Sequence, residues 1–581
     1  MRFILSMTML ISMTLTTYSA SSSQFRDLMN DTWVATDQIG RTLSMHEEAG
    51  APREDGRQVA IFYFLWLGHH GTYGPYDMTK IRAVNQENPP WGPLNSFHFW
   101  TEPELGYYLN ADEYVIRRHI HMLMDAGVDA LFFDATNAVV YTKEYRTILE
   151  VMEEIRQEGG KTPHIAFFSH NRIIQGIYDE LYAPGLYEDH WFLWDGKPLM
   201  ISAQNPALDN TPTYDDDVAE FFTFRNMWGL QRIREPNLWS FLQHYPQDIG
   251  YNEAGEAEFM SVSTAQQETY MSYPTAHGKS YHNGQQPPPE EWDFAGHNFA
   301  EQFERAIEKD PKLIFITGWN EWVAQRFEDE RGKTRFTDAW CIEYNRDIEP
   351  MRGGSTDTQY YQMVDLIRQY KGARPVPEAA GHITIALDAS FEQWDTVDIT
   401  YYDHINDTTH RNNPGWDGAG PYYNFTGRND FVTLKVAHDN ENVYFYAETK
   451  DALTPHTGPF WMLLYINADQ NPETGWEGYD MLVNARVLDE NTTTLRIRRA
   501  FGWEMVAEIP YRYEGNQLML AIPREYFEKI RGNELVDYDM AFDFHWADNI
   551  QQLDDITEFF LNGDHAPNRR FNYRYLGHAA E

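Results

Sequence analysis

Short runs of apolar and aromatic residues recur along the chain from Val59 onward, and each has the length of a buried β-strand. These runs are residues 59–66, 130–134, 164–169, 199–202, 221–224, 259–262 and 313–317. Amphipathic stretches with helical periodicity lie between several of them, at residues 112–126, 142–158 and 296–309. Because alternating strands and helices form parallel sheets, seven or eight such strands predict an α/β fold, a (β/α)8-type TIM barrel over residues 57–370.

A doubly wound sheet would show the same alternation, but it usually carries a glycine-rich first turn, which this chain lacks. The residues before the first strand, 21–56, are a mostly polar leader in which we expect one short helix around residues 23–33. Residues 194–198 (WDGKP) predict a hairpin turn added to the barrel.

The pattern changes near residue 372. Residues 371–381 (KGARPVPEAAG) predict a linker, and helical periodicity nearly disappears after it. Short alternating runs replace it, at residues 431–437, 443–449, 461–467, 481–487, 494–499, 518–522 and 540–546. Regular short strands with turn residues between them predict an all-β sandwich domain over residues 382–581.

Residues 1–20 have the three parts of a signal peptide, with one arginine, an apolar run and small residues at the end. The run is too short and too rich in Thr and Ser for a transmembrane helix, and no later stretch is long enough for membrane insertion. The segment has no cysteine for lipid attachment, and the chain's one cysteine, Cys341, excludes an intramolecular disulfide. We therefore expect a secreted or periplasmic, soluble monomer that is not a lipoprotein.

The chain of 581 residues carries 46 Lys and Arg against 88 Asp and Glu, for a formal charge of −42. This charge argues against nucleic acid and anionic lipid as partners, since both need a basic surface. Acidity also suits solubility, calcium binding or a salty habitat. Aromatic residues make up 15% of the chain, a surplus that suits stacking on sugar rings. No G-x-S-x-G elbow, Walker loop or dinucleotide fingerprint is present, so acyl hydrolase, kinase and dehydrogenase activities have no support.

Two acidic residues lie at the ends of predicted barrel strands, and each has other polar residues next to it in the sequence. Active sites of such barrels lie at the carboxyl ends of the strands. Asp134 ends one strand, and Glu321 follows another between Trp319 and Trp322. A pair of carboxyl groups is the common machinery for cleaving glycosidic bonds, and neighbouring indole rings raise the pKa of a glutamate by desolvation. Asp134 could instead cap a helix.

Other polar and aromatic residues on the same predicted face are candidates for binding sugar rings and hydroxyls. They are Trp66, His69, His70, Asp77, His98, Trp100, Asn137, His170, Gln266, Trp319, Asn320, Trp322 and Arg326. A metal at the paired histidines is a weaker alternative, because adjacent side chains point apart and no HExxH motif appears. We expect no cofactor for catalysis.

One loop of the second domain has the spacing of a calcium site. Asp469, Asn471 and Asp480 offer oxygen ligands in the segment 467–480 (NADQNPETGWEGYD). The same spacing also suits a network of Asx turns that closes a hairpin.

Residues 315–322 (FITGWNEW) resemble glycoside hydrolase family 71/99-like proteins, a barrel group related to endo-α-mannosidases. The likeness extends over residues 55–370 and includes 62–71 (FYFLWLGHHG), Asp134 in LFFDATN, and 345–350 (NRDIEP). In endo-α-mannosidases a second catalytic glutamate follows the Asn-Glu-Trp motif. Glu321 matches the first glutamate, but Ala324 stands at the second position. The partner carboxylate must then come from elsewhere, and Asp134 is the first choice.

The second domain resembles carbohydrate-binding family 9-like sandwiches. The likeness rests on Leu387-Asp388, Trp394-Asp395, the run NVYF at 442–445 and the loop at 469–480. These observations predict a secreted glycoside hydrolase, and the first resemblance leans toward an α-linked, endo-acting specificity. The alternatives are a non-catalytic glycan-binding protein on a degenerate barrel, and a second domain that only braces the first.

Overall fold

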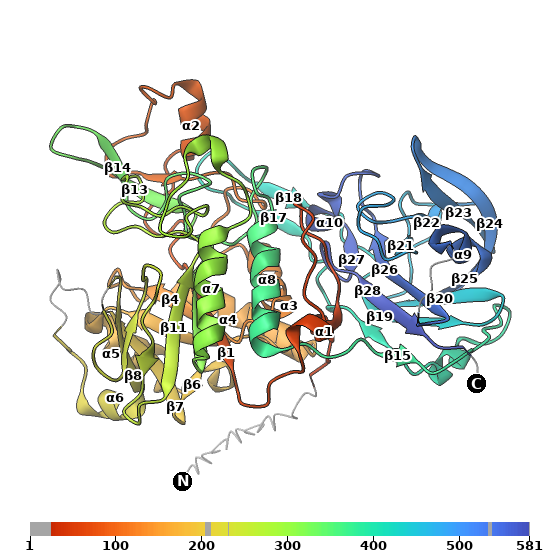
Figure 1. Cartoon of the computed structure of the whole chain (residues 1–581), viewed down its shortest axis with the longest axis horizontal. Coiled ribbons are helices and arrows are strands. Elements are labelled where there is room, and N and C mark those ends of the chain that lie inside the picture. Colours follow the sequence, from red (N-terminus) through yellow and green to blue (C-terminus); the bar gives the residue numbers. More distant parts are fainter. Residues whose placement is uncertain (1–24, 204–210, 231, 533–536, 580–581) are drawn as a thin grey trace, which may run out of the picture.

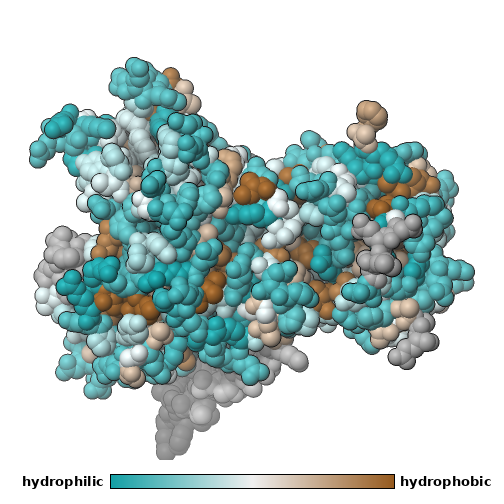
Figure 2. All heavy atoms as spheres, viewed as in Figure 1, coloured by the Kyte–Doolittle hydropathy of each residue, from teal (hydrophilic) through white to brown (hydrophobic). Residues whose placement is uncertain are grey.

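The computed structural model describes residues 25–203, 211–230, 232–532 and 537–579, so the predicted signal peptide lies outside the described residues. Two bodies lie side by side, a barrel with its helices and a curled, β-rich region (Figure 1). Figure 2 shows a mostly hydrophilic surface on this face, with hydrophobic residues in small scattered groups. Within the described part of the chain, no helix has both the length and the apolar character needed to cross a bilayer.

The first body is a nearly closed barrel of mostly parallel strands. Its strands are β1 (Gln58–Tyr63), β4 (Ala130–Ala135), β5 (His164–Ser169), β7 (Lys197–Ala203), β8 (Thr223–Trp228), β9 (Leu238–Ser240), β10 (Gly250–Tyr251), β11 (Ala257–Ser263) and β12 (Leu313–Trp319). They pair in the order β10-β11-β12-β1-β4-β5-β7-β8-β9, with β10 antiparallel to β11. A backbone hydrogen bond from Asn237 N to Tyr251 O, 2.8 Å long, joins the two ends of this order.

Helices α3 (Glu113–Asp125), α4 (Thr142–Gln157), α7 (His297–Lys309) and α8 (Thr358–Lys371) pack against the barrel strands. Shorter elements are α1 (His46–Ala49), α5 (Ile174–Ile177), α6 (Asp216–Phe221), a π-helix (Tyr178–Tyr182) and β6 (Leu193–Trp194). The 3-10 turns of this body are Asn30–Thr32, Asn171–Ile173, Glu188–His190 and Pro289–Glu291.

Alternate residues of each barrel strand face two different cores. In β1, Val59 and Ile61 pack with the helices, whereas Ala60 and Phe62 belong to the barrel interior. Burial on both faces explains why these strands form continuous apolar runs in the sequence rather than an alternating pattern. The barrel is therefore filled by side chains, and open space is left at its rim.

All seven strand predictions in the barrel overlap observed strands, and the three predicted helices are confirmed as α3, α4 and α7. The predicted hairpin is confirmed by the antiparallel pairing of β6 with β7. The run at 221–224 begins too early, because Phe221 ends α6. Strand β9 was missed because three residues are too few to show a period.

The helix expected around residues 23–33 is wrong for the described residues, which hold only a 3-10 turn at Asn30–Thr32. Tertiary contacts explain the difference. Trp33 packs edge-on against Phe571 and Tyr573, and Val34 forms a β-bridge with Asn572. The leader thus runs along the C-terminal segment.

A small four-stranded sheet covers the carboxyl ends of the barrel strands. It runs in the order β14 (Thr334–Phe336), β13 (Val323–Glu328), β3 (Phe97–Phe99), β2 (Tyr76–Asp77), and helix α2 (Met78–Val84) follows β2 (Figure 1). Strand β13 begins two residues after Glu321, so the hydrogen bonds of this sheet fix the chain on the C-terminal side of Glu321.

The second body is one curled sheet of twelve strands. Its strands are β15 (Glu378–Ala379), β16 (Tyr401–Tyr402), β19 (Phe431–His438), β20 (Asn442–Thr449), β21 (Leu463–Asn467), β22 (Met481–Val487), β23 (Thr492–Arg499), β24 (Gly502–Glu514), β25 (Gln517–Pro523), β26 (Met540–Asp548), β27 (Asp564–Ala566) and β28 (Tyr573–Gly577). The pair β17 (Arg411–Asn413) and β18 (Tyr422–Asn424), the turn Phe391–Thr396, α9 (Glu525–Arg531) and α10 (Glu558–Leu561) complete it.

The long strand β24 pairs with β23 along one part and with β25 along the other, so the sheet folds over on itself. Phe445 of β20 consequently lies against Phe542 and Phe544 of β26, with ring centroids 5.5 and 5.7 Å apart. Each of the seven predicted runs overlaps a strand, but β24 was missed because most of its residues are not buried and show no clear alternation.

The two bodies meet across buried ion pairs. Asp112 caps α3 and binds Arg411 at 2.7 Å, and at the other end of the helix Asp125 contacts His404 at 2.9 Å. A further pair joins Glu104 to Arg569, with oxygen–nitrogen distances of 2.6 and 2.9 Å. Because buried charges need good partners, these contacts hold the two bodies in one orientation.

Replacing Arg569 by Met should destabilise the protein strongly. Glu104 would remain buried without its cation, which typically lowers the free energy of unfolding by about 3–5 kcal/mol. Urea unfolding followed by tryptophan fluorescence measures this change.

The matched control is Arg499→Met, because Arg499 and its partner Glu504 are both exposed at the surface. We expect little change there. Equal stability losses in the two variants would show that the buried pair has no special role.

Candidate functional site

A pocket of about 360 Å³ opens at the carboxyl ends of the barrel strands. The segments at the ends of β1, β4, β8, β9, β11 and β12 line it, together with the loop after β14. Its aromatic wall consists of Phe62, Phe64, Trp66, Phe168, Trp228 and Phe241, and its polar side chains are Asp134, Thr136, Asn137, Gln267, Glu268, Thr269, Glu321, Thr337, Asp338 and Arg346. An apolar wall with a few converging polar groups is typical of a ligand site.

Two larger cavities lie elsewhere, of about 510 Å³ between the leader and the second body and of about 440 Å³ beside Cys341. Their carboxylates are already engaged. In the first, Glu477 pairs with Arg570 at 2.8 Å, and in the second, Glu343 accepts a hydrogen bond from Ser280 N at 2.8 Å. The pocket at the strand ends is the better candidate for chemistry, because barrel active sites lie at this end and it brings Asp134, Glu321 and Asp338 together.

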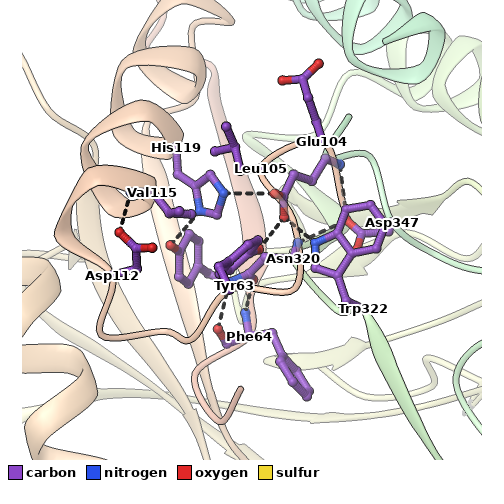
Figure 3. Close-up of polar contacts among 12 residues, drawn as sticks. Tyr63, Phe64, Glu104, Leu105, Asp112, Val115, His119, Asn320, Trp322 and Asp347 are labelled. Carbon is purple, nitrogen blue, oxygen red and sulfur yellow. Dashed lines mark hydrogen bonds and ion pairs between the residues drawn. The ribbon is translucent and has the colours of Figure 1, made fainter. Parts of the chain in front are cut away.

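Glu321 reaches this pocket from a turn that is tied to the neighbouring strand. Asn320 adopts a left-handed backbone conformation (φ 58°), and its side-chain amide pairs with Phe64 N and O at 2.7 and 3.0 Å (Figure 3). Its backbone N–H donates to Asp347 Oδ1 at 2.9 Å. These bonds fix the chain immediately before Glu321, so its carboxyl group has a defined position.

Arg346 connects the polar groups of the pocket. One of its terminal nitrogens lies 2.8 and 2.6 Å from the two carboxyl oxygens of Glu321, and 3.2 Å from Asp338 Oδ1. Its other terminal nitrogen donates to Gln267 Oε1 at 2.7 Å. The guanidinium group also lies over the ring of Phe241, 5.5 Å from its centroid. One cation thus serves two carboxyl groups.

Burial raises the pKa of Glu321 to about 8. The positive charge of Arg346 opposes this shift, while the negative charges of Asp338 and Asp134 add to it. At neutral pH the group therefore holds its proton and can act as an acid.

Asp134 is the penultimate residue of β4 and is also buried in the pocket. It accepts hydrogen bonds from Thr136 N at 3.0 Å, from Thr136 Oγ1 at 2.8 Å and from Trp66 Nε1 at 3.3 Å. Burial raises its pKa, which these hydrogen bonds oppose. The alternative of a helix cap is wrong, because α4 begins eight residues later, at Thr142, with Tyr141 at its N-cap.

Among the predicted ring-binding and hydroxyl-binding residues, Trp66 and Asn137 line the pocket. His69 and His70 adjoin it. His70 contacts the ring of Trp66 at 5.3 Å and the hydroxyl of Tyr141 at 3.0 Å, and His69 pairs with Glu144 at 2.8 Å.

Three of the predicted residues, Trp100, Trp319 and Trp322, pack beneath the Glu321 turn and do not line the pocket. The rings of Trp322 and Trp100 stack 4.7 Å apart, and Trp322 Nε1 donates to Glu349 at 2.5 Å. Glu349 also contacts His119 at 3.0 Å. Trp319 is buried against the helices. Because these rings are buried, the structure gives them a positioning role rather than contact with a ligand.

The remaining predicted residues lie outside the pocket lining. Asp77 caps α2, and His98 stacks on Tyr76 in the small sheet, where burial lowers the pKa of His98 to about 4. Arg326 donates to Gly92 O from β13 at 2.7 Å. His170 and Gln266 are buried at strand ends beside the site.

Arg346 and Asp338 are the functional candidates that sequence reasoning missed. Both come from the irregular stretch after β14, which no strand pattern places near the pocket. The segment 345–350 carried a signal only as part of a family resemblance. Ala324 is buried in β13 opposite His98.

The predicted calcium loop of the second body has an Asx turn. Asp469 Oδ1 accepts from Asn471 N at 2.9 Å, and Thr474 Oγ1 donates to the same carboxylate at 3.0 Å. Asp480 Oδ2 accepts from Ala468 N at 2.9 Å, and burial raises its pKa to about 6. The turn network is present, and calcium binding here stays a prediction.

No protein family model matches the chain, and no curated protein matches it. Among solved structures, the GH99 endo-alpha-mannosidase from Bacteroides thetaiotaomicron is 15% identical over 55% of this chain and 99% of its own, with a TM-score of 0.34. Its complex with bis-tris-propane is 17% identical over 54% of this chain and 97% of its own, with a TM-score of 0.32. The SpGH29 structure is 8% identical over 82% of this chain and 95% of its own, with a TM-score of 0.22. At these scores the likeness carries no argument about substrate or mechanism.

Proposed function

We propose that this protein is a glycoside hydrolase whose acid is Glu321. The observation that carries the proposal is a buried glutamic acid, with its pKa raised to about 8, facing a pocket that also holds Asp134, Asp338 and an aromatic wall. Hydrolysis of a glycosidic bond needs one carboxyl group that is protonated at working pH and a second that is ionised.

In this proposal Glu321 protonates the oxygen of the departing sugar. Arg346 is a positioning residue. When Glu321 gives up its proton, the new carboxylate already faces a guanidinium at 2.6 Å, which stabilises the charge as it forms. The partner carboxylate, which attacks the sugar or activates water, is Asp134. Asp338, which shares Arg346 with Glu321, is the second choice.

The finer parts of the proposal rest on the sequence. We assign the barrel to the (β/α)8 TIM type. We further propose that the enzyme cleaves α-linked bonds within a poly- or oligosaccharide chain. Export follows from the signal peptide. The curled region is proposed to be a carbohydrate-binding family 9-like sandwich. Four tryptophans of this region could by their type stack on sugar rings, namely Trp394, Trp476, Trp503 and Trp546. Trp394 and Trp546 are buried, which leaves the half-buried Trp476 and Trp503.

A non-catalytic glycan-binding protein is the second candidate. It is favoured by Ala324, since a buried alanine stands where the family resemblance would place a second acid. In that case the pocket binds sugar without turnover.

Replacing Glu321 by Gln should abolish most hydrolysis. A positioned acid contributes about 10²–10⁴-fold to rate, and glutamine keeps the shape without the proton. The measurement is product release from a panel of plant, yeast and algal polysaccharides.

Glu330→Gln is the control, because it makes the same chemical change in the exposed turn between β13 and β14. Equal release by Glu321→Gln and wild type would remove Glu321 from the mechanism. If wild type bound one glycan tightly but released no product from it, the non-catalytic glycan-binding function would be favoured.

The rate of hydrolysis should fall as the pH rises through about 8, because Glu321 must be protonated to act. Asp338→Asn should move this alkaline limb to lower pH, since the negative charge of Asp338 raises the pKa of Glu321. The profile of kcat/KM against pH measures both effects. A limb that moves upward, or that also moves in Glu330→Gln, would contradict the assignment.

A further inference from the structure

Three aspartates of the second body, Asp403, Asp407 and Asp564, lie together at its contact with the barrel, and Asp430 is a further buried aspartate of the same region. Asp403 and Asp407 follow β16, Asp430 precedes β19, and Asp564 begins β27. All four are buried. Carboxylate oxygens of Asp403, Asp407 and Asp564 lie within 4.8 Å of one another.

Several of these carboxylate oxygens have no partner in the part of the chain that the structure describes. Asp403 is fully buried, and neither of its carboxylate oxygens accepts a hydrogen bond of normal geometry. One oxygen of Asp407 and one of Asp430 also accept no such hydrogen bond. The other oxygen of Asp407 accepts from Asn568 at 2.8 Å, and Asp564 accepts from Phe431 N at 2.6 Å. Buried polar groups are nearly always paired, so this pattern calls for a ligand.

The basic side chains nearest Asp403 and Asp407 donate their printed hydrogen bonds to groups other than these carboxylates. Arg26 donates to the backbone oxygens of Asp403 and Val432, at 3.1 and 2.5 Å. His404 contacts Asp125, and Arg569 contacts Glu104. Burying carboxylates together without a counter-charge is costly, because each loses its hydration and repels the others.

We propose that Asp403, Asp407 and Asp564 bind a calcium ion. Calcium prefers six to eight oxygen ligands in flexible geometry, which suits carboxylates from several segments better than the strict octahedron of magnesium. The site is distinct from the loop at 469–480, and nothing in the hydrolase proposal depends on it.

The position of the cluster gives the ion a structural role. Asp403 is followed by His404, which binds Asp125 at the end of α3, and Asn406 bonds Glu158 just beyond α4. Asn568, which donates to Asp407, precedes the buried Arg569. The ion would therefore brace the segments through which the second body holds the barrel.

Calcium titration of the full mature chain, after treatment with a chelator, tests the site by calorimetry. Asp403→Asn should bind one equivalent of Ca²⁺ fewer than wild type. Asp398→Asn, an exposed aspartate of the same body, should bind as wild type does. Asp469→Asn should keep the equivalent that Asp403→Asn loses, which separates this site from the loop at 469–480.

Thermal unfolding supplies the second measurement and needs no variant. Added Ca²⁺ should raise the unfolding midpoint of chelator-treated wild type by several degrees, because the ion binds only the folded chain. If Asp403→Asn does not fold, Asp407→Asn takes its place in the titration. An unchanged midpoint with Ca²⁺, or full calcium stoichiometry in the folded variants, overturns the proposal and shows that protons hold the cluster.

Discussion

Burial of the Glu321 carboxyl group against Arg346 is the interaction on which the candidate site depends. A glutamate removed from water holds its proton, and a guanidinium at 2.6 Å limits how far its pKa rises. Neither condition arises from one segment. Glu321 follows β12, Arg346 lies in the loop after β14, and the ring beneath Arg346 belongs to Phe241, which follows β9.

The barrel supplies the rigidity that this arrangement needs. Its strands are buried on both faces, so their ends cannot shift without disturbing two cores. The side chain of Asn320 ties the Glu321 turn to the end of β1 through its hydrogen bonds to the backbone of Phe64. Trp322 and Glu349 hold the same turn from the opposite side. Several tryptophans near the motif therefore act as supports, although their type suggests sugar binding.

The second body is joined to the barrel by charge as much as by apolar contact. Each end of α3 carries an aspartate that binds a basic residue of the second body. The aspartate cluster lies in the same region, so several acidic side chains are buried where the two bodies meet. The two bodies are thus joined in one orientation, because each buried charge at their contact needs its partner from the other body.

The sequence by itself determined seven strands and three helices of the barrel, the change to β-structure after residue 372, and Glu321 and Asp134 near strand ends. These features are local, since a buried strand shows as an apolar run and parallel strands place their carboxyl ends together. Only the tertiary structure decided that Arg346 and Asp338 join Glu321, that Trp100 and Trp322 are buried, and that the leader lies along residues 571–573. Such contacts link residues far apart in the chain, and their strength comes from burial, which no local pattern of residues records.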